Sequence, residues 1–179
     1  KWLYHLVVSL IVTSSQAQQL PKTFLWDPKE LQSIRSEIAS KKFPSLEALQ
    51  TLESAASKAL RTKIVTVVDK KQLPPSGNKH DYLSLARYWW PNPATKDGLP
   101  YVRRDGEVNP EIYTINDHKN LSTMIRTVKI LAITYYYTGN EAYAQQVARW
   151  IKAWFIEDST RMNPHLRYAQ AVPGRNEGR

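Results

Sequence analysis

The stretch "DHKNLSTMIRTVKILAITYYYTGNEAYAQQVARWIKAWF", residues 117–155, carries the clearest structural pattern of the sequence. Its first half has apolar side chains at helical spacing on one broad face: Leu121, Met124, Ile125, Val128, Leu131 and Tyr135. Its second half has an apolar stripe of the same period: Tyr143, Val147, Trp150, Ile151 and Trp154. Asp117 and Gly139 are expected to cap the first helix, and Asn140 the second. Because the turn between them is short, the pattern predicts an antiparallel helical hairpin.

A second helical pair is expected earlier in the chain. Asp27 and Glu30, on either side of a proline, have the layout of a helix N-terminus. After a break at residues 43–44, Ser45 is expected to cap a further helix. The apolar stripe of that helix consists of Leu46, Leu49, Leu52, Ala56, Ala59 and Leu60. The sequence thus predicts an all-α fold built of antiparallel helical hairpins.

Long segments without a helical period separate these pairs. Residues 63–77 are rich in β-branched side chains and then broken by proline, so we expect them to be extended. Residues 77–114 contain prolines and glycines throughout, and residues 157–179 are rich in arginine and amides. Loops this long are usually functional or disordered. The many Trp, Tyr, Val and Leu residues of the first loop favour order.

The composition is that of a globular protein, with 42% hydrophobic and 23% charged residues. The sequence has no cysteine, which excludes disulfides, thiol catalysis and cysteine-ligated zinc. The formal net charge is +9. A generic basic surface would explain this charge, and so would a polyanionic partner, because a positive cleft concentrates an acidic ligand. Charge alone does not distinguish nucleic acid from acidic polysaccharide.

Residues 1–17 have the layout of a secretory signal peptide. A basic residue precedes an apolar run at 6–12, and Ser15 and Ala17 satisfy the small-x-small rule of signal peptidase. A buried N-terminal helix is the alternative, but polar residues follow the run at once. The run is too short to span a membrane, for which about 20 apolar residues are needed. We predict a signal peptide over 1–17, one domain over 18–179, and a periplasmic or secreted protein.

Several chemistries have no motif in this sequence. It contains no Gly-rich phosphate loop, no His-Glu-x-x-His zinc helix and no Gly-x-Ser-x-Gly elbow. The four histidines are scattered, and a lone loop histidine is more often structural than catalytic. The sequence therefore predicts no metal site.

The loop at 80–110 concentrates aromatic and arginine side chains. Its candidate ligand contacts are Arg87, Tyr88, Trp89, Trp90 and Arg103. Planar guanidinium groups bind carboxylates bidentately, and aromatic faces stack on sugar rings or on nucleic acid bases. Alternatively, the rings hold the loop against the helices while nearby acids neutralise the arginines. Because adjacent side chains diverge, we expect no more than one arginine of residues 103–104 to face a ligand.

The loop at 157–179 adds polar candidates. Its leading candidate contacts are Asn163, Tyr168 and Gln170. Amides can neutralise a carboxylate, and a tyrosine can move a proton. His165 and Arg175 are interpreted as structural, because Asn-Pro and Pro-Gly turns lie beside them.

Three strings of the sequence resemble successive motifs of one family: "KHDYLSLARYWWPNP", "GLPYVRRDGEVNPE" and "TRMNPHLRYAQAVPG". They are similar to motifs of the alginate lyase domain family, within the alginate and chondroitin lyase superfamily, and they occur in order over residues 73–179. The YWWPNP string and the MNP…YAQ…PG string are specific. The resemblance implies an incomplete α/α toroid of helical hairpins and an extracytoplasmic lyase that cuts uronate polysaccharides.

The resemblance also implies a reaction that needs no redox cofactor. An Asn or Arg withdraws charge from the uronate carboxylate, a Tyr or His removes the C5 proton, and an acid protonates the leaving oxygen. The family's Asn-His pair does not occur in this sequence and is expected beyond Arg179, so no catalytic residue is assigned.

We therefore expect a polysaccharide lyase that cleaves alginate or a related polyuronate by β-elimination. A non-catalytic acidic-glycan-binding protein on the same scaffold is the alternative. A nucleic-acid binder is a weaker third interpretation, and the predicted export argues against it. Two hairpins alone are also expected to leave apolar surface exposed, since repeated helical pairs cover one another.

Overall fold

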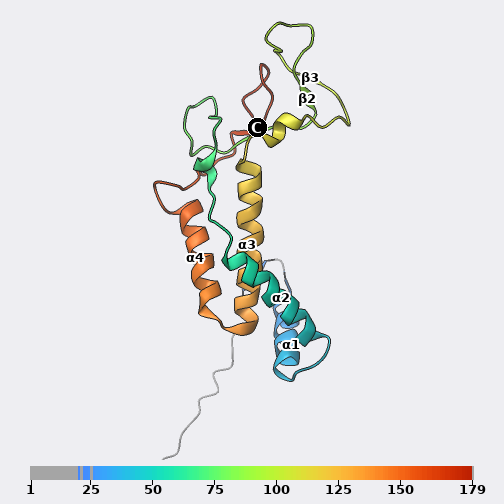
Figure 1. Ribbon diagram of the computed structural model, residues 1–179, viewed down its shortest axis with the longest axis vertical. Coiled ribbons are helices and arrows are strands. Elements are labelled where there is room, and N and C mark those ends of the chain that lie inside the picture. Colours follow the sequence, from blue (N-terminus) through green and yellow to red (C-terminus); the bar gives the residue numbers. More distant parts are fainter. Residues whose placement is uncertain (1–19, 21, 25, 179) are drawn as a thin grey trace, which may run out of the picture. The chain divides into compact units, whose positions relative to one another are not determined.

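The computed structural model describes residues 20, 22–24 and 26–178, and Figure 1 shows its ribbon. The chain divides into two compact units, Lys1–Leu46 and Glu47–Arg179. The predicted signal peptide at 1–17 lies outside the described residues. No helix of the described part is long and apolar enough to cross a membrane.

The first described helix begins as its sequence predicts. Helix α1 spans Pro28–Ala39, and the Asp27 carboxylate accepts a hydrogen bond from the Lys29 amide at 2.8 Å. Helix α2 spans Ser45–Leu60, so Ser45 is already helical. Its hydroxyl donates to the Glu37 carboxylate instead of accepting from the helix N-terminus, and the predicted cap at Ser45 is wrong. The unit boundary falls just inside α2, so the packing of α1 on α2 stays a prediction.

The predicted hairpin at 117–155 is confirmed. Helix α3 spans Asp117–Thr138 and helix α4 spans Glu141–Phe155, and the two lie side by side in Figure 1. Gly139 ends α3 with φ 68°, a left-handed conformation that glycine adopts without strain. The Asn140 side chain accepts from the Ala142 amide at 3.0 Å and so caps α4.

The buried face of α3 differs from the predicted one. Ile125 is 53% exposed and Tyr135 is 37% exposed, and Ile151 on α4 is also exposed. Thr127 and Thr134 are buried in α3 instead. The Thr134 hydroxyl donates to the Ile130 carbonyl at 2.7 Å, so this polar side chain enters the core without losing a hydrogen bond.

Two apolar clusters hold the hairpin to the segments before it. One contains Val67, Tyr82, Met124, Trp150 and Trp154, and the other contains Ala56, Ala59, Leu131 and Tyr143. The Trp154 indole donates to the Val65 carbonyl at 2.8 Å. The segment at 63–69, predicted as extended, therefore runs against α4, and only Val67–Asp69 in it forms a short 3₁₀ helix, η1.

The long loops contain short strands that an all-α prediction omits. Strand β1 (Leu83–Leu85) pairs in parallel with β4 (Tyr168–Ala171). Strand β2 (Trp89–Trp90) pairs antiparallel with β3 (Val102–Arg103), and a 3₁₀ helix, η2, follows at Pro110–Tyr113. The described part of the chain is helix-rich, and two two-stranded sheets order its long loops.

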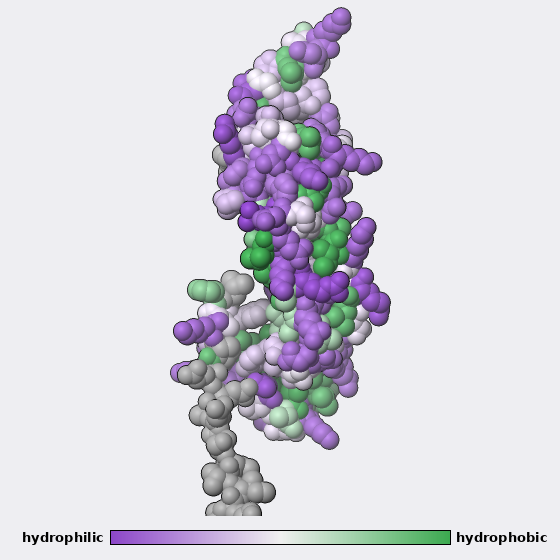
Figure 2. All heavy atoms as spheres, turned by 90° about the vertical axis from the view of Figure 1, so that its left-hand side faces the viewer, coloured by the Kyte–Doolittle hydropathy of each residue, from purple (hydrophilic) through white to green (hydrophobic). Residues whose placement is uncertain are grey.

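Apolar side chains remain on the surface of the hairpin. Ile151, Phe155 and Ile156, at the end of α4, are 37%, 44% and 62% exposed. Figure 2 views the molecule from the side on which α4 lies in Figure 1, and green apolar patches interrupt the hydrophilic surface there. Exposed apolar surface on this hairpin agrees with the expectation that two hairpins alone leave apolar surface uncovered.

Candidate functional site

The structure brings the two long loops together. The Ala86 amide donates to the Ala171 carbonyl at 3.0 Å, and the Tyr101 amide donates to the Pro173 carbonyl at 3.0 Å. The first of these contacts directly continues the parallel pairing of β1 with β4. The residues singled out in the two loops, about 80 positions apart in the sequence, therefore share one region of the fold.

A buried ion pair anchors this region. Lys70 Nζ lies 3.0 Å from the Asp117 carboxylate, and both side chains are fully buried. The same ammonium donates to three backbone carbonyls, those of Val67, Lys79 and Asp81. Burial lowers the pKa of Lys70 and raises that of Asp117, although the attraction between the two charges acts the other way.

Asp117 is therefore not the helix cap that the sequence predicts. It is the first residue of α3, and its Oδ2 atom also accepts from the Leu83 amide at 2.8 Å. The carboxylate thus joins α3 to β1 and, through Lys70, to the residues that precede the first loop. Sequence reasoning missed Lys70 altogether, because nothing local distinguishes a buried lysine from a surface one.

Asp81 connects the start of the first loop to the start of the second. Its carboxylate accepts from Asn163 Nδ2 at 2.5 Å and from the Ser76 hydroxyl at 2.6 Å, and it lies 3.1 Å from His165 Nε2. Burial alone would raise the pKa of Asp81, but these hydrogen bonds and the charges of His165 and Lys70 outweigh it and lower the pKa. This carboxylate thus holds the partly buried Asn163 side chain and contacts the more exposed His165 ring.

The other candidates of the second loop take different positions. The Tyr168 ring is buried with Leu83, Ile115 and Ala171, so it serves packing, contrary to its prediction as a ligand contact. Gln170 is exposed, and its backbone has φ 54° where the β1–β4 register is interrupted. Of the predicted contacts in this loop, Gln170 has the most accessible side chain.

The two tryptophans of the first loop lie on a short hairpin. Trp90 and Trp89 are each half-buried in strand β2. The Trp90 indole donates to the Glu107 carbonyl at 3.0 Å, and the Arg104 guanidinium lies 5.1 Å from the centre of its ring. The hairpin is thus held in part by its own rings, through contacts within the loop, whereas the sequence interpretation placed the rings against the helices. Tyr88, beside them, is half-buried as well.

Two arginines of the hairpin have an acidic neighbour. Arg103 Nε lies 2.7 Å from the Asp105 carboxylate, and Arg104 lies 3.6 Å from that of Glu107. This confirms the expectation that nearby acids partly neutralise the pair. Within the described ranges, Arg87 is exposed and no ion pair involves it.

Arg175, interpreted as structural from the sequence, joins the hairpin. Its Nε donates to the Tyr101 carbonyl at 2.7 Å, and its guanidinium lies 5.1 Å from the centre of the Trp89 ring. Gly174 makes this approach possible, because a Cβ there would lie 2.8 Å from Pro100 Cα and the backbone has φ 73°. The Pro-Gly turn was the signal in the sequence, although it indicated only a turn.

Tyr101 is not poised to remove a proton. Its hydroxyl donates to the Glu111 carboxylate at 2.6 Å. Burial and that carboxylate raise the pKa of Tyr101 to about 12. At neutral pH the hydroxyl stays protonated, so it acts here as a hydrogen-bond donor that fixes the loop to η2.

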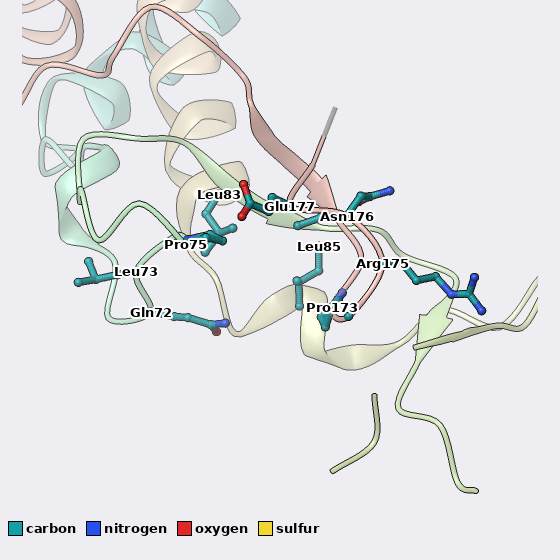
Figure 3. A pocket seen from close by; sticks show the side chains of 11 residues that line it. Gln72, Leu73, Pro75, Leu83, Leu85, Pro173, Arg175, Asn176 and Glu177 are labelled. Atoms are coloured by element: carbon teal, nitrogen blue, oxygen red, sulfur yellow. The ribbon is translucent and has the colours of Figure 1, made fainter. Parts of the chain in front are cut away.

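A pocket of about 490 Å³ opens beside the β1–β4 sheet, and Figure 3 shows its lining. Its walls are largely aliphatic: Leu73, Pro75, Leu83, Leu85 and Pro173. Gln72, Asn176 and Glu177 add polar groups. Across the described part of the chain, no group of three or more histidine, aspartate or glutamate side chains could hold a metal ion.

These features define a helix-rich protein whose two long loops present indole rings and arginines next to each other. The sequence model of the alginate lyase family matches residues 66–179. The chain therefore belongs to the alginate lyase family.

The crystal structure of an alginate lyase from Bacteroides ovatus is similar to this chain, with a TM-score of 0.76 and 39% sequence identity. The similarity covers 86% of this chain and 40% of that one, so the chain spans about two fifths of the length of this relative. No curated protein matches the sequence.

Proposed function

We propose that the full-length protein is a polysaccharide lyase that cleaves alginate or a related uronate polysaccharide by β-elimination. The observation that carries this proposal is the family match over residues 66–179. The surface of arginines and half-buried tryptophans supports an acidic sugar chain as the substrate, since rings stack on sugar faces and guanidinium groups bind carboxylates.

In this reaction a base removes the C5 proton of a uronate and the C4–O bond breaks. A C4=C5 double bond forms, and the leaving oxygen takes a proton. In this reaction the described residues hold the substrate and offset the charge of its carboxylate, which makes the C5 proton more acidic. The base and the acid are not assigned to this chain.

We further propose that the α3–α4 hairpin belongs to an incomplete α/α toroid and that the protein is periplasmic or secreted. The helical hairpin with its uncovered apolar surface supports the toroid, because neighbouring hairpins would cover that surface. The signal-peptide layout of residues 1–17 supports export.

The test is to incubate the full-length protein with polymannuronate, polyguluronate and a neutral glucan, and to follow the ultraviolet absorbance of unsaturated sugar ends. We expect product from at least one polyuronate and none from the glucan. If no polyuronate gives the unsaturated product, the protein is not a lyase of this class.

A second candidate is a protein that binds acidic glycans without cleaving them. It is favoured by one observation: three described side chains that could transfer a proton are engaged in contacts within the protein. Tyr101 donates to Glu111, His80 lies 2.7 Å from the Arg161 carbonyl, and His165 faces Asp81. Binding of an oligouronate without any unsaturated product would select this second function.

A further inference from the structure

One arginine of the site is fixed in place by contacts that leave most of its guanidinium donors unused. The Arg175 guanidinium lies over Trp89 at 5.1 Å, and its Nε donates to the Tyr101 carbonyl at 2.7 Å. A guanidinium has five N–H groups. The one on Nε donates to Tyr101, and among the described residues the four on the two Nη atoms have no hydrogen-bond partner.

Four other arginines of the two loops differ from Arg175 in having acidic partners, whereas Arg87 also has no ion pair among the described residues. Arg103, Arg104, Arg161 and Arg167 each lie within ion-pairing distance of an aspartate or glutamate. Glu177, which is close to Arg175 in sequence, lies 3.6 Å from Arg167 instead. Among the residues that the structure describes, no carboxylate lies within ion-pairing distance of Arg175.

The backbone under Arg175 is also held by several contacts. The amides of Arg175 and Asn176 both donate to the Val172 carbonyl at 3.0 Å, and the Pro173 carbonyl accepts from Tyr101. Gly174 lies in contact with Pro100. Because these contacts already fix the turn, little conformational freedom is lost when a ligand binds there.

We propose that Arg175, stacked on Trp89, is the carboxylate-binding subsite for one uronate unit of the polysaccharide and discriminates acidic from neutral sugars. The two Nη atoms hold the carboxylate in a bidentate pair, and the indole face keeps the guanidinium plane in position. The assignment rests on the proposed function. Figure 3 places Arg175 at the edge of the pocket with its guanidinium directed away from Leu83 and Leu85, so the carboxylate lies outside the aliphatic pocket.

The test compares two ligands of equal length: a mannuronate hexasaccharide and the same oligosaccharide with its carboxyl groups reduced to alcohols. Calorimetry measures the affinity of the full-length protein and of its variants R175A, R175K and R126A. Arg126 is an exposed residue well inside α3, so R126A removes the same charge away from the loops. Thermal melts confirm that each variant is folded.

We expect R175A to bind the uronate about 10- to 100-fold more weakly, the size of effect seen for a lost hydrogen bond to a charged group, and to bind the reduced ligand as the wild type does. R175K keeps the positive charge but lacks the planar guanidinium, so its affinity for the uronate should lie between those of R175A and the wild type. The affinity of R126A should match that of the wild type. An equal loss for both ligands would assign Arg175 a structural role, and no loss would remove it from the site. Either result overturns the assignment of Arg175 and leaves the proposed function standing. A wild-type protein that binds no oligouronate overturns the proposed function itself.

Discussion

Two groups of charged side chains in the larger unit are built from similar residue types and differ in burial. Lys70 and Asp117 are fully buried at a separation of 3.0 Å, and backbone carbonyls accept from the ammonium while the Leu83 amide donates to Asp117 Oδ2; Oδ1 of Asp117 is buried without a hydrogen-bond partner among the described residues. Arg103 and Asp105 are closer, at 2.7 Å, but both are more than half exposed. Water solvates each partner of the exposed pair, so that pair contributes little to stability.

This difference determines what each charge can do. A buried ion cannot lose its partner without leaving an uncompensated charge in a medium of low dielectric constant. Lys70 and Asp117 therefore hold three segments of the chain together permanently. An exposed arginine can exchange a weak internal partner for a ligand carboxylate at little cost. The cost of a mutation should follow burial and not the distance between the charges.

The largest effect is expected for Asp117→Asn. This substitution leaves the Lys70 ammonium buried without its counter-charge, and we expect the free energy of unfolding to fall by about 3–5 kcal/mol. Urea denaturation of the two proteins measures it. The matched control is Asp105→Asn, which breaks the exposed pair and should change the same quantity by less than about 1 kcal/mol. Similar losses in both variants would contradict the comparison.

A smaller loss is expected where the two loops touch. Gly174→Ala places a Cβ against Pro100 at a backbone φ of 73°, so both overpacking and strain act. We expect a loss of about 2–4 kcal/mol in the free energy of unfolding, measured by urea denaturation. Gly77→Ala is the control, since Gly77 has φ 72° but a Cβ added there would meet no atom within 4 Å. Gly77→Ala therefore measures the backbone strain alone, a loss of about 1 kcal/mol in the free energy of unfolding. Equal losses in the two variants would mean that the loops are not closely packed at Gly174.

The third effect depends on pH. Asp81 has a lowered pKa in the folded protein, so its hydrogen bonds contribute stability above the ordinary aspartate pKa of about 3.9, and this contribution is lost as the pH falls further toward the folded pKa. Asp81→Asn should remove that part of the acid dependence and cost about 1–3 kcal/mol at neutral pH. Denaturation at several acidic pH values measures it. Asp158→Asn, at an exposed position, serves as control. If the free energy of unfolding of Asp81→Asn decreases at acidic pH as it does in the wild type, Asp81 is not the source of this pH dependence.

The parts of the fold that the sequence predicts are local. The cap at Asp27, the turn at residues 139–140 and the α3–α4 hairpin all depend on side chains within a few residues of one another, which propensity and periodicity describe well. The family, too, was accessible from short motifs. The pairing of β1 with β4 joins residues more than 80 positions apart, and no local pattern specifies such a partner.

In the candidate site, too, local sequence does not predict the roles of single residues that depend on distant contacts. Asp117 has the sequence context of a cap and Lys70 that of a surface lysine, and only their distant contact with each other reveals a buried pair. Tyr168 and Arg175 exchange their expected roles, since the ring enters the core and the arginine reaches the hairpin. Burial depends on what packs above a side chain, so residue type alone could not separate these outcomes.

The smallest effect separates the two tryptophans, whose roles the sequence leaves open. Trp90→Phe removes the hydrogen bond to the Glu107 carbonyl and should lower the free energy of unfolding by about 1 kcal/mol. Trp89 carries the Arg175 guanidinium on its face, so Trp89→Leu should weaken oligouronate binding by a larger factor than Trp90→Phe does. Denaturation and calorimetry on the two variants give both quantities. If Trp90→Phe weakens uronate binding as much as Trp89→Leu, the hairpin acts as one stacking surface, and the distinction between a ring that holds the loop and a ring that positions a ligand fails.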